Sequence, residues 1–129
     1  MNLTQFIKTY LGKKIDFDGN YGYQCVDLYR QYCKDVLEVN QSPSINTAKE
    51  IFDKPGELVA TADSKTTDYS AGDILVWDNG REGHVAILVA IYNTRYFVVL
   101  EQDGYAQDGV KLNFRSREGL RGYLWKKVG

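Results

Sequence analysis

The stretch Gly72–Gly80, GDILVWDNG, divides the chain into two halves with different patterns. Four consecutive apolar residues that favour strands precede an Asp-Asn-Gly turn, and this pattern predicts a strand. Two further apolar runs, His84–Ile91 and Tyr96–Leu100, flank the polar turn Asn93-Thr94, and Tyr123–Trp125 predicts a last strand. The C-terminal half therefore predicts an antiparallel sheet.

The N-terminal half shows helical periodicity instead. Apolar residues recur at helical spacing, at Leu3, Phe6, Ile7, Tyr10 and Leu11, and Gly12 is expected to end this helix. A second helix is expected to begin at Gln24 or Cys25, with one face formed by Cys25, Tyr29, Tyr32, Cys33 and Val36. A short third helix starts at the capping-box pair Thr47 and Glu50, and the polar, turn-rich segment Leu58–Ala71 is typical of a connection. Helices followed by antiparallel strands predict an α+β fold, with N-terminal helices packed on a C-terminal antiparallel β-sheet.

Length and composition limit the classes of function. A chain of 129 residues forms one domain, residues 1–129, with a hydrophobic core of its own. Sixteen basic and 17 acidic residues give a net charge of −1, so there is no electrostatic reason to expect a nucleic-acid partner. No apolar run approaches the roughly 18 residues that cross a bilayer, and Met1–Gln5 does not begin a signal peptide. We expect a monomer with no membrane insertion.

The two cysteines are expected to be free thiols with different environments. Cys25 and Cys33 are eight residues apart, and in a helix their Cα atoms would be about 12 Å apart, too far for a disulfide. Cys33 lies deep in its helix and is interpreted as core filling. Cys25 lies at a helix N-terminus, where the dipole and the unpaired N–H groups stabilise a thiolate and could receive an oxyanion.

His84 is the only histidine. A hairpin with the two-residue loop Asn93-Thr94 pairs positions whose numbers sum to 187, so Asp103 faces His84 and Glu101 faces Ala86. Side chains alternate along strands, so His84 and both carboxylates would project from one face of the sheet.

A carboxylate beside His84 would fix the imidazole tautomer, and the other ring nitrogen could then take the proton of the Cys25 thiol. These patterns alone also allow a non-catalytic, structural interpretation. Cys25 could be core filling, His84 a structural side chain, and the two carboxylates a solvated strand face.

Four blocks resemble, in order, those of the CHAP family (cysteine, histidine-dependent amidohydrolase/peptidase). They are Gly22–Leu28 (GYQCVDL), Gly72–Trp77 (GDILVW), Gly83–Ile87 (GHVAI) and Glu101–Gly104 (EQDG). The resemblance spans nearly the whole chain. It implies a papain-like α+β fold, cleavage of amide bonds in bacterial peptidoglycan, and most closely the catalytic domain of a phage lysin. Such a domain is fused to or excised from a wall-binding domain, and acts on the wall after release through a phage membrane pore or from the virion.

The resemblance also implies roles for particular residues. Cys25 would be the nucleophile, His84 the base and Glu101 the residue that orients the base, with Gln24 beside the oxyanion hole. Family members usually carry Asn where this chain has Asp103, so the role of Asp103 stays open. Two aromatic residues near the cysteine and the histidine are candidates for lining the groove, Tyr23 and Trp77, although Trp77 fits core filling at least as well.

The loop before Cys25 has the ligand spacing of an EF-hand calcium loop. Oxygen ligands stand at positions one, three, five, seven and twelve, which are Asp16, Asp18, Asn20, the Gly22 carbonyl and Asp27. The loop departs from that pattern because its sixth residue is not glycine, and an acidic turn that caps the helix is the alternative. Three convergent carboxylates repel one another, which favours a bound hard cation, calcium. The resemblance points to the same ion, since some CHAP enzymes of staphylococcal phage lysins place calcium in the loop before the cysteine.

Two rival functions follow from the same features. A non-catalytic, calcium-dependent wall-binding module would keep the acidic loop and leave Cys25 structural. An intracellular cysteine amidase acting on a small substrate would use the thiol and histidine without a wall.

Overall fold

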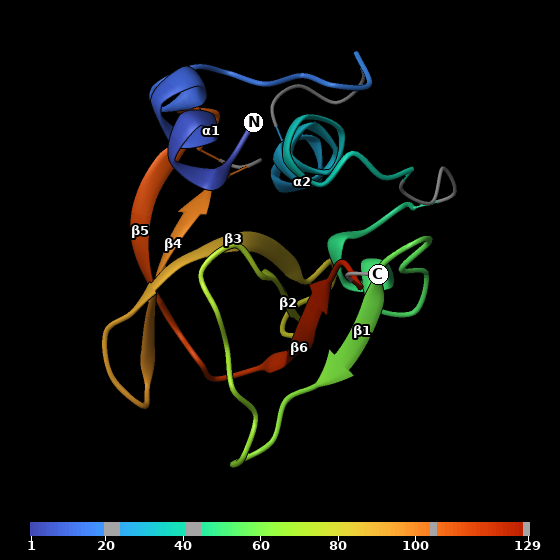
Figure 1. Cartoon of the computed structure of the whole chain (residues 1–129), viewed down its shortest axis with the longest axis vertical. Helices are drawn as coiled ribbons and strands as arrows, with labels where there is room; N and C mark the ends of the chain where they lie inside the picture. Colours follow the sequence, from blue (N-terminus) through green and yellow to red (C-terminus); the bar gives the residue numbers. More distant parts are fainter. Residues whose placement is uncertain (20–23, 41–44, 104–105, 128–129) are drawn as a thin grey trace.

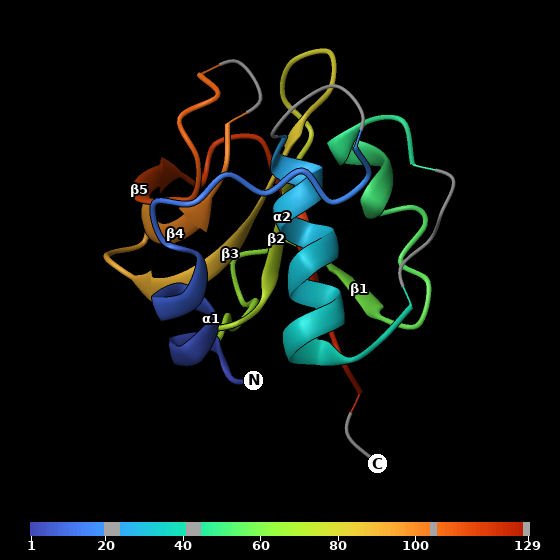
Figure 2. The same cartoon turned by 90° about the horizontal axis from the view of Figure 1, so that it is seen from above.

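The computed structural model describes residues 1–19, 24–40, 45–103 and 106–127. Two helices lie on one face of a strongly curved sheet (Figure 1). They are α1, Leu3–Tyr10, and α2, Cys25–Tyr32, and α2 continues into a π-helical turn, Cys33–Leu37. A short 3-10 helix, Ala48–Ile51, confirms the third helical segment. Seen from above, α1 and α2 both lie in front of the sheet (Figure 2).

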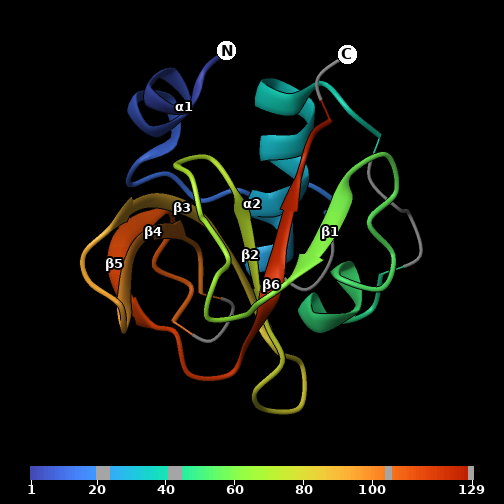
Figure 3. The ribbon, with the colours of Figure 1, turned by 60° about the horizontal axis from the view of Figure 1, so that its bottom comes forward.

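The sheet has six antiparallel strands in the order β1-β6-β2-β3-β4-β5 (Figure 3). Their bounds are Val59–Ala62 for β1, Ile74–Trp77 for β2, His84–Ile91 for β3, Tyr96–Glu101 for β4, Lys111–Ser116 for β5 and Leu120–Trp125 for β6. The predicted α+β arrangement, with N-terminal helices on a C-terminal antiparallel sheet, is confirmed.

Alternation along the central strands produces two hydrophobic cores. One face of β2 and β3 packs against the helices through a buried set that includes Val76, Val85, Ile87, Phe6 and Leu28. The opposite face packs under the segment that carries Tyr69, through a set that includes Leu75, Ala86, Leu88, Phe97 and Val99. His84 and Glu101 share this second face, because they stand two residues from Ala86 and from Val99.

Both edge strands were missed in the sequence. β1 lies inside Leu58–Ala71, which the sequence predicted to be a connection, and β5 was not recognised at all. Each edge strand pairs with a single neighbour, and most of their side chains are half-buried or exposed. An edge strand with little burial has a weak apolar pattern, so pairing with a neighbour, rather than its own sequence, determines its structure.

The β3–β4 register is confirmed at the end of the hairpin that matters for the site. Ile87 pairs with Leu100, a sum of 187, as the sequence predicted. Nearer the turn, Ala90 pairs with Val98, a sum of 188, because the register shifts between Leu88 and Ala90. The turn prediction was therefore wrong by one residue, and a β-bulge restores the predicted register beyond it.

Candidate active site

Cys25 is the first residue of α2 and is half-buried. The preceding residue, Gln24, has an extended backbone, and its N–H donates to Oδ2 of Asp27 at 2.9 Å, which caps the helix start. Cys33 is 0% exposed, and burial raises the pKa of its thiol to about 12. The two thiols therefore differ as expected, since Cys25 alone is open to a reaction partner.

His84 lies between the thiol of Cys25 and the carboxylate of Glu101. Its side chain lies close enough to the Cys25 thiol for that group to raise its pKa, and its Nε2 lies 3.1 Å from Oε1 of Glu101. Burial lowers the pKa of His84, but the interactions with Cys25 and Glu101 outweigh burial and raise the pKa to about 9. Cys25 can reach His84 from the helical layer because His84 is the first residue of β3, at the end of that strand.

Glu101, the last residue of β4, is 0% exposed and fully paired. Besides His84, it accepts hydrogen bonds from Nε and Nη2 of Arg115 at 2.6 and 3.0 Å and from Nδ2 of Asn113 at 3.0 Å. Burial raises the pKa of Glu101, but the donors from His84, Arg115 and Asn113 lower it to about 2. Glu101 is therefore an ionised acceptor, so Nε2 of His84 carries a proton and Nδ1 is the nitrogen left for the thiol.

Arg115 and Asn113 are the members of this cluster that sequence reasoning missed. Both lie on β5, opposite Phe97 and Val99 of β4, and so on the same face as Glu101. The sequence offers one signal for them, the alternation of polar Asn113 and Arg115 with apolar Leu112 and Phe114, but it is too short to predict a strand by itself.

Asp103 lies beyond the end of β4, so the sheet does not carry it opposite His84 as the sequence predicted. Its Oδ1 accepts from the backbone N–H of Ala106 at 3.5 Å, a local contact. The correction follows from the length of the strand, since pairing by register applies only while the ladder continues.

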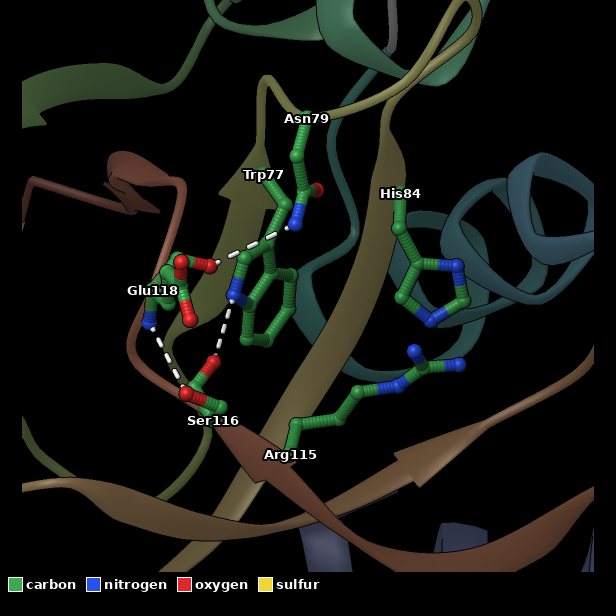
Figure 4. A pocket seen from close by; sticks show the side chains of 6 residues that line it. All are labelled: Trp77, Asn79, His84, Arg115, Ser116 and Glu118. Carbon is green, nitrogen blue, oxygen red and sulfur yellow. Dashed lines mark hydrogen bonds between the residues drawn. The ribbon is translucent and has the colours of Figure 1, made fainter.

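A cavity of about 140 Å³ lies beside His84 (Figure 4). Its lining residues are Trp77, Asn79, His84, Arg115, Ser116 and Glu118. Trp77 is only 2% exposed, its Nε1 donates to the Ser116 carbonyl at 2.9 Å, and its ring centroid lies 5.8 Å from that of His84. The indole therefore forms a fixed wall of the cavity. Tyr23, the other predicted groove residue, lies outside the described residues.

The acidic loop gathers the carboxylates of Asp16, Asp18 and Asp27, one oxygen of each within 4.8 Å of the others. Asp16 and Asp18 are exposed, whereas Asp27 is 1% exposed. Oδ1 of Asp27 is buried without a hydrogen-bond partner among the described residues. Burial and the charges of Asp18 and Asp16 outweigh the backbone hydrogen bonds and raise the pKa of Asp27 to about 6. The predicted ligands Asn20 and Gly22 lie outside the described residues.

Within the described part of the chain, no helix is long and apolar enough to cross a membrane.

Comparisons with known proteins identify the family of this chain. The CHAP domain model matches residues 15–103. The chain is 31% identical over 106 residues to endolysin PlyTW of Staphylococcus phage Twort, an alignment that covers 76% of this chain and 22% of that protein. The chain thus spans about a fifth of the length of this relative.

Two solved structures are similar in fold. Wild-type endolysin LysIME-EF1 superposes with a TM-score of 0.80 at 21% identity, over 98% of this chain and 64% of that one. Ly7917, solved with the hydrolyzing product of MDP, superposes with a TM-score of 0.63 at 18% identity, over 94% and 60% of the two chains. Since the family model matches well over half of the 129 residues, the chain belongs to the CHAP domain family.

Proposed function

We propose that this chain is a peptidoglycan hydrolase that cleaves amide bonds of the bacterial cell wall through a thioester on Cys25. The proposal rests on one observation: Cys25 contacts His84, and His84 contacts Glu101. These contacts join a helix N-terminus to a buried, ionised carboxylate. Family membership and the likeness to an endolysin support the wall as substrate.

The contacts fit acyl transfer. The thiol proton passes to Nδ1 of His84, whose raised pKa favours the imidazolium, before Sγ attacks the carbonyl carbon, and N–H groups at the start of α2 receive the charge that develops on the oxygen. The intermediate collapses with loss of the amine, which takes the proton from His84. Water then attacks the thioester, gives its proton to His84, and releases a carboxylic acid and the thiol.

The surroundings of His84 suit both proton transfers. Glu101 holds the Nε2–H, and with it the ring orientation, through a hydrogen bond that stabilises the imidazolium formed in the first step. Arg115 and Asn113 occupy the remaining positions around Glu101, so the carboxylate is held from several sides.

The first prediction tests the nucleophile and the base. Cys25→Ser and His84→Ala should each lower the rate of clearing of susceptible cell walls by at least about 10³-fold, with the fold intact by circular dichroism. Cys33→Ser is the matched control and should keep most of the activity, because Cys33 is a buried core residue. Selective uptake of iodoacetamide by Cys33, with activity falling in parallel, would contradict the assignment.

The bond that is cut is named by the products. An amidase leaves a free lactyl carboxylate and a new N-terminal L-alanine, whereas an endopeptidase leaves new termini within the stem peptide or the cross-bridge. Mass analysis of purified peptidoglycan before and after digestion separates these outcomes. Intact peptidoglycan bound by the wild-type protein would instead support the non-catalytic wall-binding module.

We also propose that the acidic loop binds calcium. Three carboxylates that converge at one place, and the Oδ1 of buried Asp27 that has no hydrogen-bond partner among the described residues, fit a hard cation with oxygen ligands. Asp16, Asp18 and Asp27 would hold the ion. Asp27 also caps the helix that begins at Cys25, so an ion there would act on the start of the same helix.

A further inference from the structure

Gln102 joins three backbone groups that are far apart in sequence. Its side chain is 0% exposed, and its Oε1 accepts from the N–H of Ile15 at 2.8 Å. Its Nε2 donates to the carbonyl of Ile15 at 2.7 Å and to the carbonyl of Gln24 at 2.9 Å. The side-chain amide thus meets both polar groups of Ile15, as a neighbouring strand would, and one of Gln24.

These contacts lie next to the groups that would react. Gln102 follows Glu101, which bonds His84, and Gln24 precedes Cys25, whose thiol interacts with the same ring. A single buried amide therefore connects the strand that ends in the carboxylate to the helix that starts with the thiol. Ile15 adds a second attachment point, since it lies in the segment that leads from α1 to that helix.

We propose that Gln102 is a positioning residue that holds the thiol of Cys25 within reach of His84. The bond to the Gln24 carbonyl fixes the residue at the helix start, and the two bonds to Ile15 fix the rotamer of Gln102 itself. A cysteine–histidine contact tolerates little error, because a displacement of about 1 Å at a reacting group can cost on the order of 10²-fold in rate.

The competing explanation is that Gln102 only satisfies buried backbone groups. Removing it would then leave the Ile15 and Gln24 groups unpaired and lower stability, without a particular effect on the thiol. The two explanations agree on melting temperature and differ on the reactivity of Cys25. The test must therefore measure the reactivity of Cys25 in the folded protein, beside a variant that loses a hydrogen bond elsewhere on the same helix.

The test uses Gln102→Met, which keeps the length of the side chain and removes all three hydrogen bonds. Tyr32→Phe is the matched control, because it removes one buried hydrogen bond, from the Tyr32 hydroxyl to the Gly72 carbonyl, at the other end of α2. Both are measured well below their melting temperatures, for the rate of Cys25 alkylation by iodoacetamide at neutral pH and for kcat and KM on purified peptidoglycan.

We expect Gln102→Met to slow alkylation on the order of tenfold, since the thiol loses the base that takes its proton. It should lower kcat on the order of 10²-fold and change KM little. Tyr32→Phe should leave both rates close to wild type. If Gln102→Met does not fold, Gln102→Asn replaces it, because that variant keeps a neutral amide but is one carbon too short to bond Ile15 and Gln24 together.

Alkylation as fast in the Gln102 variant as in Tyr32→Phe would overturn the inference and leave Gln102 a core amide. The kcat prediction rests on the proposed function, but alkylation does not. A wild-type protein that fails to cut peptidoglycan, yet whose Cys25 alkylation depends on Gln102, would defeat the proposed function and support the positioning role.

Discussion

Glu101 and Asp27 are both buried carboxylates, at 0% and 1% exposure, but they are held in opposite ways. Glu101 accepts hydrogen bonds from a guanidinium, an amide and an imidazole, and its pKa falls to about 2. Asp27 lies beside Asp16 and Asp18, keeps one oxygen without a partner among the described residues, and has a pKa raised to about 6. Burial is common to both, so the charge of the neighbours decides the direction of each pKa.

The difference also sets opposite dependences of stability on pH. The lowered pKa of Glu101 contributes stability above its ordinary value of 4.5, and that contribution is lost as pH falls through about 2. The raised pKa of Asp27 contributes stability below its ordinary value of 3.8, and that contribution is lost as pH rises through about 6. At neutral pH the negative charge of Glu101 is therefore offset by donors from the chain, whereas ionised Asp27 lies beside two further carboxylates, and the proposed cation would offset that charge.

The largest expected effect comes from removing the charge of Glu101. Glu101→Gln should lower the rate of wall cleavage by up to about 10⁴-fold, because a neutral amide neither fixes the His84 tautomer nor stabilises the imidazolium. Asp103→Asn is the matched variant and should lose far less, since Asp103 lies beyond the strand and the family usually carries Asn there. Equal losses in turbidity clearing would show that Asp103 shares the orienting role.

The second, smaller effect comes from removing the guanidinium of Arg115, which leaves Glu101, among the described residues, without a cationic hydrogen-bond partner other than His84. Arg115→Met should raise the pKa of Glu101 and lower the free energy of unfolding by about 3 kcal/mol at neutral pH, because it leaves a buried charge without its ion pair. Denaturant unfolding measures the loss.

Arg115→Lys is the control for the geometry of this pair. It keeps the charge but cannot form the two parallel hydrogen bonds to Glu101, so it should recover part of the stability and less of the activity. If Arg115→Met and the wild type have the same free energy of unfolding at neutral pH, then Asn113 and His84 alone are enough to stabilise the buried charge of Glu101.

The two carboxylates also differ in how far the sequence could predict them. The acidic loop and the start of α2 at Cys25 are local patterns, and the structure brings together the described members of the loop. The contact of His84 with Glu101 was within reach because both belong to apolar, strongly patterned strands whose register the alternation fixes near the site.

Arg115, Asn113 and Gln102 were out of reach for physical reasons. Arg115 and Asn113 lie on an edge strand whose burial pattern is too weak to reveal a strand. Gln102 makes its contacts with backbone groups at sequence separations of 87 and 78, and the sequence carries no pattern for a side chain that bonds backbone. Asp103 was misplaced because the sequence does not show where a ladder of hydrogen bonds ends.

The smallest expected effect tests the proposed calcium site at Asp27. At pH 7.5, calcium should raise the melting temperature relative to EGTA, by an amount equivalent to about 2.7 kcal/mol at a hundredfold excess over Kd. The gain should shrink at pH 5, because protons then compete with calcium for Asp27, whose pKa is about 6. Calorimetry of calcium binding and thermal melts at both pH values measure this, and magnesium should substitute poorly because it requires a stricter octahedral geometry.

Variants separate an ion site from an acidic turn. Asp16→Ala and Asp18→Ala should abolish the calcium response, and Asp108→Ala, which removes an exposed carboxylate outside the cluster, should keep it. Asp27→Asn should also abolish the response. In EGTA at pH 7.5 it should be at least as stable as wild type, since it removes an unpaired buried charge and keeps an oxygen that can accept from the Gln24 N–H. Identical melts in EGTA and calcium, with no heat of binding, would reduce the cluster to an acidic turn in which Asp27 only caps the helix that begins at Cys25.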